Sequence, residues 1–162
     1  MNQKGITRIS MLVVVLSMAL AACAPAAVET PVVTETAGTG QPSGPVTLTV
    51  TGLVGAQLDL ADADLQAMDV VTVTAEHPKN GPGEYTGVRL NDLLDAAQVQ
   101  DAAVTLTLIA IDGYSYDVDL AAVRACTDCL LGFGETAGSY LAVMPGQEGK
   151  AWVKDVVSIE VK

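Results

Sequence analysis

An Asp112-Gly113 pair between two apolar segments limits the fold of this chain more than any other feature of the sequence. Residues 103–111 are rich in Val, Leu and Ile, and residues 114–120 alternate apolar with polar side chains. Asp-Gly readily adopts the positive φ angles of a tight turn, and between alternating segments it is typical of a hairpin. We therefore predict two antiparallel strands over 103–120.

Other segments share the two-residue period of strands, in which every second side chain faces the core. The predicted strands are 46–51, 70–75, 140–144, 151–154 and 156–161. Short helices are predicted at 62–68 and 120–125. A third helix, beginning at Asn91 or Asp92, is indicated by the helical spacing of Leu90, Leu93, Leu94 and Ala97. Residues 77–85, HPKNGPGEY, predict a loop because Pro and Gly interrupt regular structure.

These elements together predict the fold class. We expect an α+β domain over residues 46–162, dominated by strands in a mixed, barrel-like sheet arrangement with short helices.

The first 45 residues read as a bacterial lipoprotein leader and a tether. Lys4 and Arg8 precede a short apolar run, which ends in the tetrad Leu-Ala-Ala-Cys at 20–23. The run is shorter than the roughly 20 apolar residues of a spanning helix. We predict a signal peptide over 1–22, lipidation of Cys23, and a disordered tether rich in Pro, Thr and Gly over 23–45. The expected location is the cell envelope, outside the cytoplasm and attached to a membrane by the lipid anchor.

Charge excludes one class of partner. Without residues 1–22 the chain keeps six basic and nineteen acidic residues, a net charge of −13. Such a surface repels phosphate backbones, so we expect no nucleic-acid partner.

The cysteine pair Cys126 and Cys129 has three interpretations. Outside the cytoplasm, two close cysteines most simply form a disulfide. A redox-active dithiol and two ordinary reduced cysteines remain open. A c-type haem site is excluded because Leu130 stands where that motif needs histidine, and two thiols are too few for a four-cysteine zinc site.

Residues 77–85 are the candidate binding segment. His77 is the only histidine, and Lys79 and Tyr85 follow it. An ordinary surface histidine and a ligand or anion contact are both consistent with this pattern, and loops often carry binding residues. A small-molecule or protein partner is therefore predicted here. No serine lies in a Gly-x-Ser-x-Gly motif, which argues against a serine hydrolase.

Several segments, taken together, resemble the sulfite-oxidase-type molybdopterin-binding oxidoreductase domain. They follow one another in the family's order: 48–54 (LTVTGLV), 86–94 (TGVRLNDLL), 111–114 (IDGY), 143–146 (VMPG), 152–156 (WVKDV) and 159–161 (IEV). The resemblance implies that family's fold and, in its catalytic members, a molybdopterin cofactor.

The chain departs from the family at the metal ligand. The resemblance implies that a cysteine three residues after Thr72 would bind molybdenum, but Ala75 stands there and has no ligand atom. The pterin phosphate also needs several cations, and few are present. The candidates for cofactor contacts are His77, Lys79, Tyr85 and Arg89.

Three functions follow from these observations. The first is a non-catalytic binding or accessory module, with no cofactor and no metal. The second is a reduced molybdopterin-dependent oxidoreductase, which holds its cofactor through His77 or Glu76 instead of a thiolate. The third is a redox accessory protein that uses Cys126 and Cys129.

Overall fold

The computed structural model describes residues 41–162 of the chain. The predicted signal peptide, Cys23 and most of the predicted tether lie outside the described residues. Within 41–162, no helix combines the length and the apolar character that crossing a membrane requires. The elements of the described part are β1 (Val46–Gly52), β2 (Leu58–Ala61), α1 (Asp62–Gln66), β3 (Val70–His77), β4 (Gly81–Arg89), α2 (Leu90–Ala96), β5 (Thr105–Ala110), β6 (Ser115–Asp119), α3 (Leu120–Ala125), β7 (Leu130–Phe133), β8 (Tyr140–Val143) and β9 (Val156–Val161).

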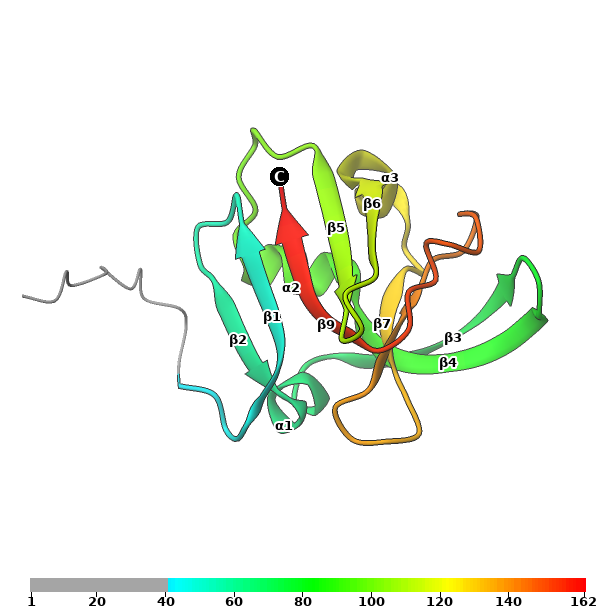
Figure 1. Ribbon diagram of the computed structural model, residues 1–162, viewed down its shortest axis with the longest axis horizontal. Helices are drawn as coiled ribbons and strands as arrows, with labels where there is room; N and C mark the ends of the chain where they lie inside the picture. The colour runs from blue at the N-terminus through cyan, green and yellow to red at the C-terminus, as the bar shows by residue number, and fades with distance from the viewer. Residues whose placement is uncertain (1–40) are drawn as a thin grey trace, which may run out of the picture. The chain divides into compact units, whose positions relative to one another are not determined.

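The strands form two sheets, which Figure 1 shows with the β3–β4 hairpin extending to the right of the larger sheet. The five-stranded sheet has the order β2-β1-β9-β5-β6, and the four-stranded sheet has the order β3-β4-β7-β8. Strands β1 and β9 pair in parallel, and the other strand pairs are antiparallel. The predicted class, a strand-rich α+β fold with short helices, is confirmed.

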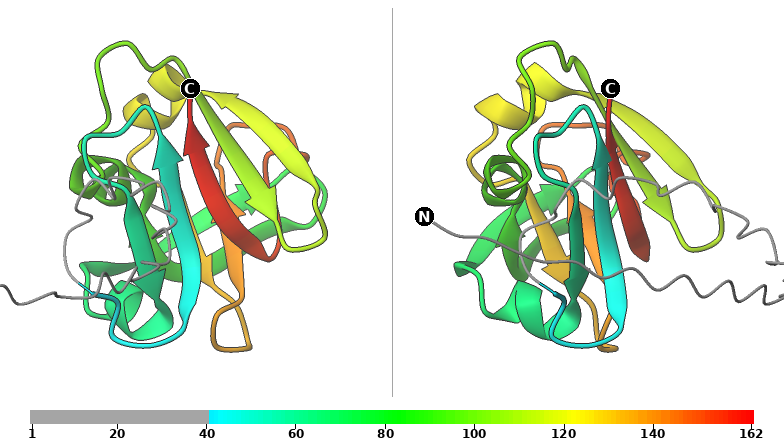
Figure 2. Two further views of the ribbon diagram at one scale, coloured as in Figure 1. Left: turned by 60° about the vertical axis from the view of Figure 1, so that its left-hand side comes forward. Right: turned by 90° about the vertical axis from the view of Figure 1, so that its left-hand side faces the viewer.

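The buried apolar side chains form one core to which both sheets contribute. Figure 2 shows how the strands of the two sheets are arranged. Alternation along each strand turns every second side chain inward. The five-stranded sheet contributes Leu48, Leu108 and Ile159, and the four-stranded sheet contributes Val88 and Leu131. Full burial of one such side chain stabilises the fold by about 1.5–3 kcal/mol.

The Asp112-Gly113 hairpin is confirmed. Strands β5 and β6 pair in antiparallel register from Thr105 opposite Asp119 to Ile109 opposite Ser115. Gly113 has a φ of +86°, the left-handed conformation that this turn requires.

The predicted loop over 77–85 is wrong. Strand β3 continues to His77, β4 begins at Gly81, and only a three-residue turn separates them. Pro82 is tolerated within β4 because β4 pairs with β7 only from Gly87 to Arg89, so around Pro82 the strand has a partner on one side only. The candidate segment is therefore the end of a long hairpin.

Two other local predictions need correction. Helix α2 begins at Leu90, and Arg89 rather than an Asn or Asp side chain precedes it. The segment 151–154 forms no strand, although Lys154 makes an isolated bridge to Leu141. The four residues that set the helical spacing of α2 are nevertheless all buried, as predicted: Leu90, Leu93, Leu94 and Ala97.

Candidate functional site

The β3–β4 hairpin brings two of the predicted contact residues, His77 and Tyr85, onto one face with Ala75. Val73 pairs with Tyr85, Ala75 with Gly83, and His77 with Gly81. Because side chains alternate along strands and paired residues share a face, Ala75, His77 and Tyr85 lie on the same side. The Ala75–Gly83 pair lies between the two aromatic side chains.

The indole of Trp152 packs on this face. Its ring centroid lies 4.8 Å from that of His77 and 5.4 Å from that of Tyr85, both in edge-to-face geometry. Trp152 is 5% exposed and Ala75 is 4% exposed. Since the indole reaches both His77 and Tyr85, it lies over the stretch between them, where Ala75 is buried.

Trp152 carries an unsatisfied polar atom. Its Nε1–H is buried and has no hydrogen-bond acceptor among the described residues. Sequence reasoning did not select Trp152 as a site residue. The one signal available was that it is the only tryptophan of the chain.

The turn after β3 fixes the tautomer of His77. The backbone N–H groups of Lys79 and Asn80 donate to Nδ1 at 3.0 and 3.2 Å. A nitrogen that accepts hydrogen bonds carries a lone pair, so the proton of the neutral imidazole is on Nε2. The Nε2–H of His77 is therefore a hydrogen-bond donor that takes no part in the hydrogen bonds of the turn.

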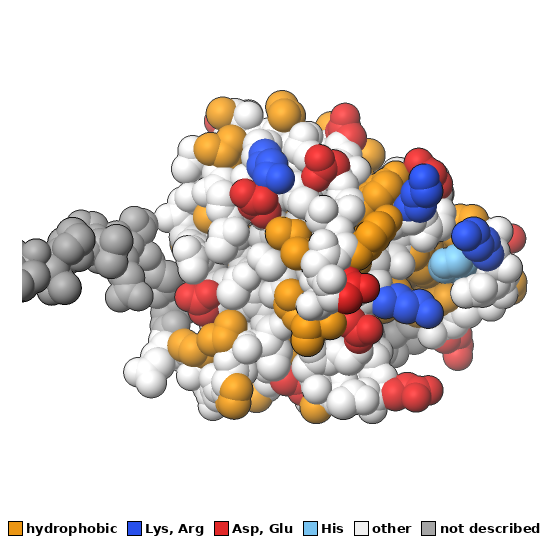
Figure 3. Space-filling model, viewed as in Figure 1, with side chains coloured by type: hydrophobic (Ala, Val, Ile, Leu, Met, Phe, Trp, Pro, Cys, Tyr) orange, Lys and Arg blue, Asp and Glu red, His pale blue; other side chains and the backbone are white. Residues whose placement is uncertain are grey.

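The lysines around this hairpin differ from the other cations of the described part. Arg89, Arg124 and Lys162 each lie within salt-bridge distance of a carboxylate, on Asp69, Asp95 and Glu160 respectively. No such partner exists within residues 41–162 for Lys79, Lys150 or Lys154, which are all exposed. Figure 3 shows basic side chains gathered around the single histidine.

The segment that leads to Trp152 lies against the hairpin end. A Cβ built on Gly149 would lie 3.8 Å from His77 Cε1 and 3.8 Å from Lys79 Cε. Lys150 is therefore close to Lys79 although the two are far apart in sequence. We call the surface formed by His77, Lys79 and Lys150 the basic face.

Arg89, the fourth predicted contact residue, does not join this group. It ends β4 at the opposite end from His77, and its Nε donates to the carbonyl of Thr127 at 3.2 Å. Arg89 therefore supports the cysteine segment instead.

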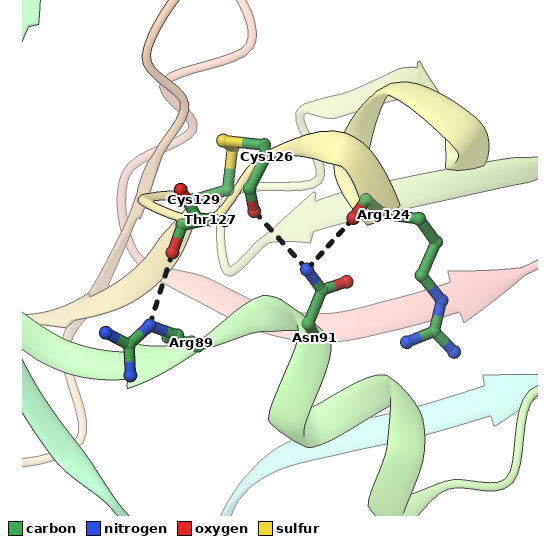
Figure 4. Close-up of a disulfide and its surroundings, with 6 residues drawn as sticks. All are labelled: Arg89, Asn91, Arg124, Cys126, Thr127 and Cys129. Carbon is green, nitrogen blue, oxygen red and sulfur yellow. Dashed lines mark hydrogen bonds between the residues drawn. A yellow bond between two sulfur atoms is a disulfide. The ribbon is translucent and has the colours of Figure 1, made fainter.

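The structure joins Cys126 and Cys129 by a disulfide. Figure 4 shows how the segment that it closes receives hydrogen bonds. Asn91 Nδ2 donates to the carbonyl of Cys126 at 3.3 Å, and the N–H of Leu90 donates to the carbonyl of Cys129 at 3.0 Å. The disulfide thus holds carbonyl acceptors at the start of α2, and Cys129 is 2% exposed.

A half-buried polar network around the buried Tyr140 lies away from the hairpin. The Tyr140 hydroxyl donates to Asp62 Oδ1 at 3.0 Å and lies 2.7 Å from Thr47 Oγ1. Burial raises the pKa of Tyr140 to about 12, and the hydrogen bond to Asp62 adds to the rise. Thr47 and Asp62 also line a shallow hollow of about 300 Å³ with Gly138. Sequence reasoning missed this network because its members lie on distant segments.

The residues present do not fit a molybdopterin centre. Ala75, at the position where the sequence resemblance implies a metal ligand, is buried beside Trp152 and offers no ligand atom. Both cysteines of the described part are joined in the disulfide, and no group of three or more His, Cys, Asp or Glu side chains within 41–162 is placed to hold a metal ion. The hairpin face instead offers hydrogen-bond donors and positive charge.

Comparison with solved structures shows a likeness of fold. The chain is similar in structure to the sulfane dehydrogenase SoxCD from Paracoccus pantotrophus, with a TM-score of 0.60 and 24% sequence identity. The match covers 70% of this chain and 37% of that chain, so this protein spans little more than a third of its length. No family model matches the sequence, and no curated protein does. The likeness establishes the fold.

Proposed function

We propose that this protein is a membrane-anchored, extracytoplasmic binding or accessory module, built on a molybdopterin-oxidoreductase-type domain that performs no metal redox chemistry. The fold is similar to that of a sulfane dehydrogenase. The observation that carries the proposal is the burial of Ala75 beside Trp152, because a methyl group supplies no ligand atom where the resembled family places a thiolate.

Metal and pterin analysis tests this proposal. We expect protein purified from cells supplied with molybdate to contain no more molybdenum than an unrelated protein prepared in the same way. Acid oxidation is expected to release no fluorescent pterin. Stoichiometric molybdenum or pterin would overturn the proposal and establish the oxidoreductase alternative.

The disulfide supports a structural role for the cysteines within this module. Cys129 is buried, and reactive cysteines are typically accessible to their substrates. We expect a thiol titration of the native protein to detect no free thiol at Cys126 or Cys129 under mild reducing conditions. A rapid, reversible reduction that leaves the fold intact would favour the redox accessory protein instead.

The lipid anchor is tested separately. Residues 20–23 match a lipoprotein cleavage site, and several acyl chains on Cys23 would hold the protein stably on a membrane. We expect Cys23→Ser to abolish incorporation of labelled fatty acid and to move the protein from the membrane fraction to the soluble fraction. Unchanged labelling of the variant would contradict the assignment.

A further inference from the structure

We propose that the basic face binds an acidic segment of a partner protein. This inference rests on the proposed function, because it names the class of partner that the module binds. It assigns the contact to His77 and Lys79, at the end of the β3–β4 hairpin, and to Lys150, on the segment that packs against it.

Charge is the first argument. The described part is strongly acidic, yet Lys79, Lys150 and Lys154 have no carboxylate within salt-bridge distance among residues 41–162, whereas the other three cations do. Positive charges left without an internal partner in an acidic protein form a local region of opposite sign. Such a region attracts a negatively charged partner and orients it.

Hydrogen-bonding capacity is the second argument. The imidazole of His77 has its proton on Nε2, because Nδ1 accepts hydrogen bonds from the backbone N–H groups of Lys79 and Asn80. Together with the ammonium groups of Lys79 and Lys150, the His77 Nε2–H gives this surface several hydrogen-bond donors. Carboxylates accept without donating, so they complement such a cluster.

Three carboxylates of the hairpin and of the segment beside it are not paired with these lysines. Glu148 Oε1 accepts a hydrogen bond from Tyr116 at 2.9 Å, which raises the pKa of that phenol. Glu76 and Glu84 alternate with the inner-face residues of the hairpin and lie on its outer, exposed side. Within residues 41–162, no carboxylate lies within salt-bridge distance of Lys79 or Lys150, so both charges are available to a negatively charged partner.

Neighbouring apolar side chains favour a protein segment over a small ion. The Tyr114 hydroxyl donates to the carbonyl of Lys150 at 3.3 Å, so the β5–β6 turn adjoins the basic face. At this turn Ile111 is 74% exposed and Tyr114 is 43% exposed. A peptide with both acidic and apolar side chains uses the two parts of this surface, whereas a small anion uses only the lysines.

The single tryptophan supplies the readout. We expect a synthetic decapeptide of glutamates and two leucines to change the fluorescence of Trp152 saturably at low salt, and to lose affinity as salt rises. The Lys79→Gln, Lys150→Gln double variant is expected to bind about tenfold more weakly, since each exposed ion pair contributes up to about 1 kcal/mol. Lys162→Gln, which removes a lysine already paired with Glu160, serves as the matched control.

Each outcome decides the proposal. Binding that the double variant weakens and the control retains supports it, provided that both variants melt at the temperature of the parent protein. Absence of saturable binding, equal affinity in all three proteins, or equal competition by inorganic sulfate at matched concentration would overturn it. If the peptide does not bind and the protein contains no molybdenum, an acidic partner is excluded, but the proposed non-catalytic module is still supported.

Discussion

Gly87 shows how a single position can be fixed by its neighbours. It lies in β4 where the strand pairs with β7, and a Cβ built there would lie 2.0 Å from the carbonyl oxygen of Leu131. Real Cβ atoms do not approach backbone oxygen so closely. The two strands can keep their register only if residue 87 has no side chain.

We therefore expect Gly87→Ala to reduce the free energy of unfolding by more than about 2 kcal/mol, because the strands must separate or shift. Urea denaturation of the parent and the variant measures this. Gly44→Ala is the control, since its Cβ would meet only Ala61 at an ordinary 3.6 Å. Equal losses in the two variants would contradict this explanation.

Tyr140 makes stability depend on alkaline pH. Its pKa rises from about 10 to about 12 in the folded state, so the unfolded chain loses this proton first as pH increases. A group whose pKa is higher in the folded state than in the unfolded state stabilises the fold fully when the pH is below the unfolded-state pKa. This stabilisation is lost as the pH rises to the folded-state pKa. The contribution is therefore expected to decline between pH 10 and 12.

The Tyr140→Phe variant shows how much of the pH dependence of stability comes from Tyr140 and not from the other tyrosines. We expect the variant to be less stable than the parent protein at pH 8 by about 1–2 kcal/mol, because Asp62 and Thr47 lose a buried partner. The difference is expected to shrink as pH rises toward 12. Parallel pH profiles of the two proteins, from denaturant melts, would rule out Tyr140 as the cause.

The segment between α3 and β7 binds the junction of β4 and α2 through its backbone carbonyls. The disulfide closes it, and its carbonyls accept hydrogen bonds from Arg89, Leu90 and Asn91 at the junction of β4 and α2. Stiffening this segment keeps acceptors in place for a helix start that has no side-chain cap.

Removing the disulfide is expected to cost about 2 kcal/mol of stability, the chain-entropy value for so short a loop. The Cys126→Ser, Cys129→Ser variant provides the measurement in denaturant. Hydrogen exchange is expected to accelerate more at the amide of Leu90, in α2, than at the amide of Leu108, which lies in β5 of the five-stranded sheet. Uniform acceleration at both amides would mean that the disulfide acts only through global stability.

The excess of acidic residues acts on the molecule collectively. The chain has nineteen acidic and eight basic residues, so carboxylates repel one another across the surface of the folded domain. At 0.1 M salt, charges more than about 10 Å apart are largely screened from one another.

We expect the melting temperature to rise by a few degrees when sodium chloride increases from about 10 mM to about 150 mM, since screening relieves repulsion in the compact state. Differential scanning calorimetry measures the change. Sucrose at the same osmolality is the control for effects other than ionic strength. A melting temperature that falls with salt would show that attractive ion pairs outweigh the repulsion.

Local patterns predicted most of the elements correctly. The alternation in 46–51, 70–75 and 156–161, the Asp112-Gly113 turn and the leucine spacing of α2 each depend on neighbours a few residues away, and each appears in the structure. Two short strands, β2 and β7, escaped prediction. Each of these strands has only four residues, which is too short for a two-residue alternation to be recognised against the flanking sequence.

The candidate site needed contacts between distant segments. His77, Lys79 and Tyr85 were selected from their own sequence, but Pro and Gly concealed the hairpin that carries them, because pairing between strands overrides the local tendency of these residues to break structure. Trp152 and Lys150 reach this hairpin from near the other end of the chain. The periodicity of the sequence determines which side of each strand is apolar, whereas packing between sheets determines which side chains become neighbours, since such contacts follow from the three-dimensional path of the chain.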